Sequence, residues 1–391
     1  MAGAAVTVLL AAGCSQATTS APAPSGQPSQ PGQSAQSEDF RVGLEAPLTG
    51  TQSELGQGML RGAQLAASKL NSSGGILGKQ VTIVPIDDAA DPVTGTAAAE
   101  AAVGSIDAVV GPYNSGVGLA TLPIYRDAGL VPMRLTSADN TAGLGFTLQP
   151  MTSQIAPTAG AAIGNWLKAG SVAIVYDETA DYTRLAASAL QSDLRGRGVA
   201  VSAFIPIAPG QAGYDDALAQ AAATNPAVTY LATYYPEAAV LAKGLAAATS
   251  PSTCVADYSA FDNGFVTNAG VDVARRCDVL GVPSPSDFRG SADLVASYQQ
   301  AFAAPPNVWS PYTYDSVLLL ADAITRADSA EAVALAPALA ATNGWSGWTG
   351  PVTLELPSGN RVPSQVAVLQ VGADGTFSID KDWAASTGFT Y

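Results

Sequence analysis

The segment VTIVPIDDAADPVTGTAAAEAAVGSIDAVVGPYNSG, residues 81–116, carries the pattern that decides the fold. It holds a β-branched run at 81–86, an alanine-rich helical stretch at 92–103 and a short apolar run at 108–111, and another helix starts at Ser115. Strands that alternate with helices are typical of βαβ units, in which a helix connects two parallel strands. The segment therefore predicts a parallel sheet that is covered by helices.

The alternation continues on both sides of this segment. Apolar residues at helical spacing predict a helix over 56–71, and a strand precedes it at 40–44. A second run of alternating elements starts after Gln154 and predicts a second α/β lobe. The other predicted elements are helices at 115–128, 157–168, 182–195, 214–223, 237–248, 291–302 and 314–327, and strands at 130–135, 172–176, 199–207, 228–233, 350–354, 359–361 and 364–371.

Composition limits the classes of function. The 391 residues are enough for two lobes with separate cores. A formal net charge of −15 disfavours nucleic acid as a partner. The chain has no histidine, which excludes a Ser-His-Asp hydrolase and removes the commonest transition-metal ligand. We therefore expect no cofactor and no metal site, and we interpret the pair Asp87 and Asp88 as loop and capping residues.

The N-terminal residues predict export and anchoring. The apolar stretch 4–12 is too short to span a bilayer and is typical of a signal peptide, although no Lys or Arg precedes it. Cys14 follows small residues as in a bacterial lipobox, which has Leu where Ala11 stands here. We expect a lipoprotein signal peptide over residues 1–14, lipidation at Cys14, and a disordered tether over 15–37, which has no charged residue.

The other two cysteines, Cys254 and Cys277, form an even pair. In an oxidising compartment such a pair predicts a disulfide, whose loop would be worth roughly 3 kcal/mol of unfolded-state entropy. The alternative is two buried free thiols.

Several fragments, in their order and spacing, resemble the type I periplasmic binding proteins of the leucine/isoleucine/valine-binding group. The resemblance covers about residues 38–382. It rests on VGLEAPLTG (42–50), GAQLA (62–66), NSSGGILGK (71–79), DD (87–88) with DP (91–92), VGPYNS (110–115) and GWTGPV (347–352).

The resemblance implies an α/β fold of two Rossmann-like lobes, joined by a three-stranded hinge around a central ligand cleft. Crossovers are expected near Pro150, Pro283 and Gln365. The N-terminal lobe would then comprise 38–149 and 284–364, and the C-terminal lobe 150–283 and 365–391.

The resemblance also implies a function without catalysis. We expect the substrate-binding component of an ABC importer, which closes like a clamp on a small amino acid, branched-chain or related. The alternatives are an amide, an aromatic acid or another carboxylate as ligand, or a role as a ligand sensor. The expected partners are the small-molecule ligand, the permease subunits and, through the lipid anchor, the outer face of the cell membrane; the chain itself is expected to be monomeric.

Ligand-binding residues of the N-terminal lobe follow from the same resemblance. Ser115, with the neighbouring Asn114, stands where a helix starts and would bind a carboxylate; the plain alternative is that Ser115 is only a helix N-cap. Thr136 and Ser137 supply hydroxyls for the ligand, with the register open by one residue. Leu55 lies where side-chain specificity is set.

The C-terminal lobe supplies aromatic residues and an acid. Tyr182 and Tyr234 match aromatic positions that line the cleft. An amino-acid ligand also needs a carboxylate for its ammonium group, and Asp262 is the first choice over Asp257. If neither acid reaches the cleft, a neutral ligand or one with only a carboxylate is favoured. Trp345 and Trp348 are expected to pack in the core.

Overall fold

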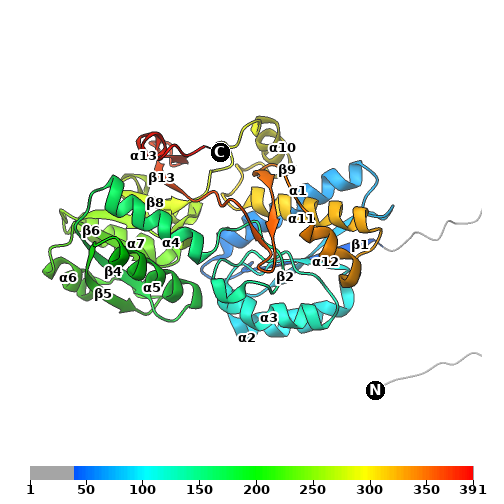
Figure 1. Ribbon diagram of the computed structural model, residues 1–391, viewed down its shortest axis with the longest axis horizontal. Helices are drawn as coiled ribbons and strands as arrows, with labels where there is room; N and C mark the ends of the chain where they lie inside the picture. Colours follow the sequence, from blue (N-terminus) through cyan, green and yellow to red (C-terminus); the bar gives the residue numbers. More distant parts are fainter. Residues whose placement is uncertain (1–38, 391) are drawn as a thin grey trace, which may run out of the picture. The chain divides into compact units, whose positions relative to one another are not determined.

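The computed structural model describes residues 39–390 (Figure 1). The expected signal peptide, the lipidation site Cys14 and the tether over 15–37 lie outside these residues. Two sheets dominate the described part of the chain, a three-stranded sheet of order β2-β1-β3 and a seven-stranded sheet of order β14-β13-β8-β7-β6-β4-β5. Each sheet is the centre of one α/β lobe, which confirms the predicted fold class.

The N-terminal lobe is built on a parallel sheet in which β1 lies between β2 and β3. Helix α11, from far along the chain, packs against α1, and α12 packs against α11. The elements are β1 (Phe40–Ala46), α1 (Ser53–Ser72), β2 (Val81–Asp87), α2 (Pro92–Ala102), β3 (Ala108–Val110), α3 (Ser115–Asp127), α10 (Ala292–Phe302), α11 (Ser310–Ala327), α12 (Ala332–Ala340), and the short strands β9 (Trp345–Gly347), β10 (Gly350–Val352), β11 (Leu354–Glu355) and β12 (Asn360–Arg361).

The C-terminal lobe has five parallel strands and an antiparallel edge formed by β13 and β14. Its elements are α4 (Thr152–Ala161), a π-helical turn (Ala162–Trp166), β4 (Ser171–Asp177), α5 (Asp181–Gly196), β5 (Ala200–Ile207), α6 (Asp215–Ala223), β6 (Val228–Ala232), α7 (Tyr235–Ala247), β7 (Thr253–Ala256), α8 (Asn263–Ala269), α9 (Val271–Ala274), β8 (Cys277–Gly281), β13 (Ala367–Val371), β14 (Phe377–Ile379) and α13 (Lys381–Thr387).

The burial of strands β3 and β6 explains why the alternation of strands and helices could be recognised in the sequence. Every residue of both strands is buried, as expected for strands covered by helices on both faces. Cys254 on β7 pairs with Cys277 on β8, and the two are joined by a disulfide in the structure.

Three predictions about elements were wrong in detail. The strand expected at 130–135 is absent; within it only Met133 forms a bridge, to Val110 and Phe146, because Pro132 beside it has no N–H for a ladder. The helix expected from 157 begins at Thr152, and the one expected from 314 begins at Ser310. Strands β7, β8, β9 and β14 and helices α8, α9, α12 and α13 were not predicted.

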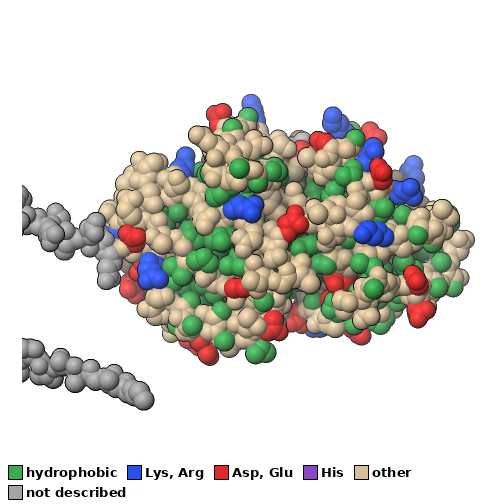
Figure 2. All heavy atoms as spheres, turned by 180° about the vertical axis from the view of Figure 1, so that it is seen from behind, with side chains coloured by type: hydrophobic (Ala, Val, Ile, Leu, Met, Phe, Trp, Pro, Cys, Tyr) green, Lys and Arg blue, Asp and Glu red, His purple; other side chains and the backbone are tan. Residues whose placement is uncertain are grey.

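Charge is spread thinly over the surface. On the face shown in Figure 2, Lys and Arg side chains are scattered, some beside Asp or Glu, and form no continuous basic patch. Over residues 39–390, no helix combines the length and the apolar character that crossing a membrane requires.

Candidate ligand-binding site

A small cavity lies where the two lobes meet. The N-terminal lobe lines it with Tyr113, Ser115 and Ser137. The C-terminal lobe lines it with four residues from three segments of chain, Tyr182, Tyr234, Tyr258 and Ser259. Its volume is about 10 Å³, room for one water molecule. A ligand of amino-acid size therefore requires the lobes or the tyrosine rings to move apart.

Three helices begin at this cavity. Ser115 is the first residue of α3, Tyr182 the second residue of α5, and Tyr234 the N-cap residue of α7. The turn into α3 depends on Gly111, which has a φ of +107°. A Cβ at this position would lie 2.1 Å from the Glu45 carbonyl oxygen, so only glycine fits. Because helix N-termini carry partial positive charge, the cavity favours a negatively charged group.

Aromatic rings form most of the cavity wall. The ring centroids of Tyr234 lie 6.4 Å from Tyr113 and 6.3 Å from Tyr182, and Tyr182 lies 6.4 Å from Tyr258. Behind them, Trp309 packs on Tyr113 at 5.5 Å and on Tyr258 at 5.3 Å. Burial raises the pKa of Tyr113, Tyr182, Tyr234 and Tyr258, so all four hydroxyls stay protonated at neutral pH.

Some hydroxyls of the cavity make hydrogen bonds to other residues, and others do not. Ser115 Oγ accepts a 3.1 Å hydrogen bond from the Ala138 amide, and the Tyr258 hydroxyl donates to Gln149 Oε1. The Tyr182 hydroxyl has no hydrogen-bond partner among the described residues. The Ser137 hydroxyl offsets part of the rise in the pKa of Tyr258, yet it makes no hydrogen bond of normal geometry.

Both candidate acids are buried, but neither lines the cavity. Asp257 accepts from the Tyr230 hydroxyl at 2.6 Å and from the Ser259 amide at 3.1 Å. Asp262 caps α8 through the Gly264 amide at 2.8 Å. Asp262, the first choice for the ammonium-binding acid, lies outside the cavity lining, and its carboxylate accepts from the Gly264 amide and from Asn307 Nδ2.

Some of the other predicted site residues line the cavity and others do not. Ser115, Ser137, Tyr182 and Tyr234 line the cavity. Thr136 does not, because its hydroxyl lies 2.7 Å from that of Thr141. Leu55 and Asn114, the other two residues predicted in the N-terminal lobe, also lie outside the cavity lining.

Leu55 is fully buried in the core on α1. Asn114 occupies the N-cap position of α3, so Ser115 is the first helical residue rather than the expected N-cap. The Asn114 amide donates to Gln52 Oε1 at 3.0 Å, and its Oδ1 has no partner among the described residues.

Three cavity residues were missed: Tyr113, Tyr258 and Ser259. Tyr113 stood inside the fragment VGPYNS, directly before the predicted helix start. Tyr258 and Ser259 follow strand β7, in a segment from which only an acid, Asp257 or Asp262, was expected to reach the ligand.

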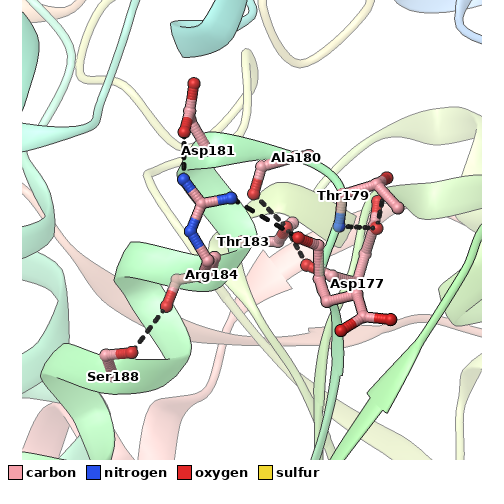
Figure 3. A network of polar contacts seen from close by, with 8 residues as sticks. Asp177, Thr179, Ala180, Asp181, Thr183, Arg184 and Ser188 are labelled. Carbon is pink, nitrogen blue, oxygen red and sulfur yellow. Dashed lines mark hydrogen bonds and ion pairs between the residues drawn. The ribbon is translucent and has the colours of Figure 1, made fainter.

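A groove of about 360 Å³ shares Tyr234 with the cavity and also lies between the lobes. The turn between β4 and α5 forms one side of it, and Figure 3 shows the polar contacts of this turn. There, Asp177 Oδ1 accepts from the Thr179 amide at 2.8 Å, and Asp181 pairs with Arg184. These contacts fix the start of α5 and, with it, Tyr182.

Comparison with known proteins identifies the family of this chain. The family model "Periplasmic binding protein" matches residues 39–376. The Leu/Ile/Val-binding protein BraC3 of Rhizobium johnstonii is 30% identical over 77% of this chain and 83% of that protein. Leu/Ile/Val-binding protein homolog 2 of Brucella abortus is 28% identical over 77% of this chain and 82% of that protein.

Solved structures show the same fold. A leucine-binding protein from Thermotoga maritima has a TM-score of 0.81 at 19% identity, with 87% of this chain and 97% of that chain covered. A solute-binding protein from R. palustris in complex with benzoate has a TM-score of 0.77 at 22% identity, covering 87% and 95%. With the family model matching most of its length, this chain belongs to the type I periplasmic binding proteins of the leucine/isoleucine/valine-binding group.

Proposed function

We propose that this protein is the substrate-binding component of an ABC importer, which encloses a small carboxylate-bearing ligand between its lobes without chemical change. The observation that carries the proposal is the cavity itself, since both lobes contribute hydroxyls to it and Tyr182 holds an unpaired one. Buried polar groups without partners are rare and mark places where another molecule completes the hydrogen bonding.

Direct contacts between the lobes support closure as the mechanism. The Tyr235 hydroxyl, at the start of α7, donates at 2.7 Å to the Thr51 carbonyl before α1. Tyr113 and Tyr234 meet across the cavity. In an open form these contacts separate, and the ligand shifts the balance toward the closed form by its higher affinity for it. We place the lobe boundaries at crossovers near Pro150, Pro283 and Gln365.

The location and partners belong to the same proposal. The protein would act outside the cytoplasm, anchored through lipid on Cys14 and a tether over 15–37, and would deliver its ligand to the permease subunits. Two ligand classes deserve testing first. Relatives are named for leucine, isoleucine and valine, and a structural neighbour holds benzoate.

A thermal-shift screen tests the proposal. Amino acids, amides, and aliphatic and aromatic carboxylates would each be added to the purified chain. A ligand at about 100 times its Kd stabilises the folded protein by about 2.7 kcal/mol, a rise of several degrees in Tm. Tyr182→Phe should reduce the shift, whereas the control Tyr176→Phe, whose ring packs on Phe204, should keep it. A screen in which no compound raises the Tm would contradict the proposal.

A further inference from the structure

The residues that line the cavity favour a negatively charged group over a positively charged one. Its seven lining residues are four tyrosines and three serines, with no Asp, Glu, Lys or Arg among them. We infer that the ligand of this protein presents a carboxylate to the cavity and carries no α-ammonium group, so that α-amino acids are poor ligands. The inference rests on the proposed function, because it names the ligand class of that same site.

The acids near the cavity residues in sequence already have partners, and Asp181, which precedes Tyr182 and lines the adjoining groove, pairs with Arg184. Asp257 is bound by Tyr230 and by both the amide and the hydroxyl of Ser259. Asp262 is bound by the Gly264 amide and by Asn307 Nδ2. Each carboxylate caps a helix start and neither lines the cavity, so neither accepts a hydrogen bond from an ammonium group enclosed there. An ammonium group enclosed in the cavity would lose its water without gaining a charged acceptor, which is costly.

Four unpaired polar groups in the cavity or directly behind it can donate, whereas the unpaired Asn114 Oδ1 in the adjoining groove is an acceptor. The Tyr182 and Ser137 hydroxyls line it, and neither makes a hydrogen bond of normal geometry to another residue. In the layer behind, Trp309 Nε1 and Gln149 Nε2 are buried without partners among the described residues, and both are donors only. Gln149 adjoins the cavity through its bond to the Tyr258 hydroxyl. A ligand rich in acceptors satisfies such a site.

Two further features decide between an anion and a cation. The faces of aromatic rings attract cations, so a tyrosine-lined cavity by itself would also suit an organic ammonium. However, the starts of α3, α5 and α7 converge here from both lobes, and their free amides favour negative charge. Unpaired donors and helix N-termini act in the same direction, and both disfavour a cation.

Matched ligands test the inference by isothermal titration calorimetry on the purified full chain. One set is leucine, isocaproate, which lacks the ammonium, and isopentylamine, which lacks the carboxylate. The second set is phenylalanine, hydrocinnamate and phenethylamine. In the set whose side chain fits, we expect the carboxylate to bind at least about tenfold more tightly than the amino acid, since the latter buries an unpaired charge. The amine should not bind.

Variants of Ser137 test the cause. Ser137→Asp adds a carboxylate to the cavity wall, and this supplies the charged acceptor that an ammonium group lacks, so the amino acid should become the better ligand. The matched neutral variant Ser137→Asn should keep the order of the wild type. Circular dichroism and Tm establish that both variants fold, and the wild-type series stands without them.

The outcomes separate the two claims. Tighter binding of the carboxylate, reversed only in Ser137→Asp, supports the inference. Binding of leucine or phenylalanine as tightly as the deaminated compound overturns the inference and leaves the proposed function intact. If none of the six compounds binds to the wild type, the inference fails, and the thermal-shift screen alone decides the proposed function.

Discussion

The side-chain amide of Asn307 donates a 3.1 Å hydrogen bond to the buried carboxylate of Asp262. Asn307 lies just before α11, which packs on α1, whereas Asp262 begins α8 beside the seven-stranded sheet. The bond thus joins segments of the two lobes. Burial raises the pKa of Asp262 to about 7, and the nearby charge of Glu54 adds to the rise.

This raised pKa predicts a pH dependence of stability. When the pKa of a carboxyl group is higher in the folded than in the unfolded protein, its contribution to folding stability is complete below about pH 4. This contribution is lost as the pH rises through about 7. Asp262→Asn should therefore lose less stability than the wild type between pH 5 and 8, by roughly 2 kcal/mol. Thermal denaturation at several pH values measures this. Identical slopes for the two proteins would refute it, and the exposed Asp272→Asn serves as control.

Two further buried acids predict a loss of stability in alkaline solution. Glu45 and Asp88 are fully buried, and Glu45 Oε1 and Asp88 Oδ2 have no hydrogen-bond partner among the described residues. Burial, together with the charge of Asp88, raises the pKa of Glu45 well above its ordinary value, and burial raises that of Asp88 to about 7. Their ionisation therefore costs folding free energy as pH rises.

Glu45→Gln should raise the free energy of unfolding by about 1–2 kcal/mol at pH 8, because the amide accepts from Thr121 as Glu45 does and carries no charge. At pH 5 the variant and the wild type should be nearly equal. Urea denaturation at both pH values checks this, with the exposed Glu100→Gln as the matched control. A loss of stability at pH 8 would contradict the account.

Arg134 is a fully buried cation that positions the chain around Ser137. Its guanidinium donates to the carbonyl oxygens of Thr136 at 3.3 Å, Gly145 at 3.3 Å and Ser358 at 3.1 Å, and burial lowers its pKa to about 10. Arg134→Met leaves the Thr136 and Gly145 carbonyls without this donor, whereas the Ser358 carbonyl keeps the Gly143 amide. The substitution should cost about 3 kcal/mol of folding stability.

The same variant should weaken ligand binding, since the segment that presents Ser137 loses its anchor. Chemical denaturation and calorimetry measure the two effects. Arg126→Met, on the exposed end of α3, should change stability by less than about 0.5 kcal/mol. Equal effects of the two substitutions would show that Arg134 has no such role.

The bond between Cys254 and Cys277 predicts sensitivity to reduction. The two residues are 23 apart in sequence, and closing a loop of that size is worth about 3 kcal/mol. The double variant Cys254→Ala/Cys277→Ala should have a lower Tm than the wild type, and dithiothreitol should lower the Tm of the wild type only. Peptide mapping under non-reducing conditions should recover the linked peptides; two free thiols in the exported protein would disprove the linkage.

Most of the fold was predictable because buried parallel strands leave apolar runs that helical segments separate. The segment 130–135 is mostly apolar, like a buried strand, but Pro132 has no backbone N–H, so the segment does not form the hydrogen bonds of a strand. Among site residues, those at helix starts after strands were found, such as Ser115 and Tyr182, because strand ends and helix starts are readable in sequence.

The sequence alone could not separate a ligand-binding acid from a capping acid. Asp is the residue type that caps helices as well as the one that binds ammonium, so Asp257 and Asp262 looked like ligand-binding residues while they serve η4 (Tyr258–Ala260) and α8. Similarly, Thr136 is held by Thr141 and Arg134, contacts that only the tertiary structure brings together.

A crystal structure of the protein with the tightest-binding compound of the matched series tests the central claim most directly. The account predicts one ligand enclosed between the lobes, with its carboxylate within hydrogen-bond distance of the Ser137 and Tyr182 hydroxyls. A ligand bound elsewhere, or one that touches only one lobe, would contradict it.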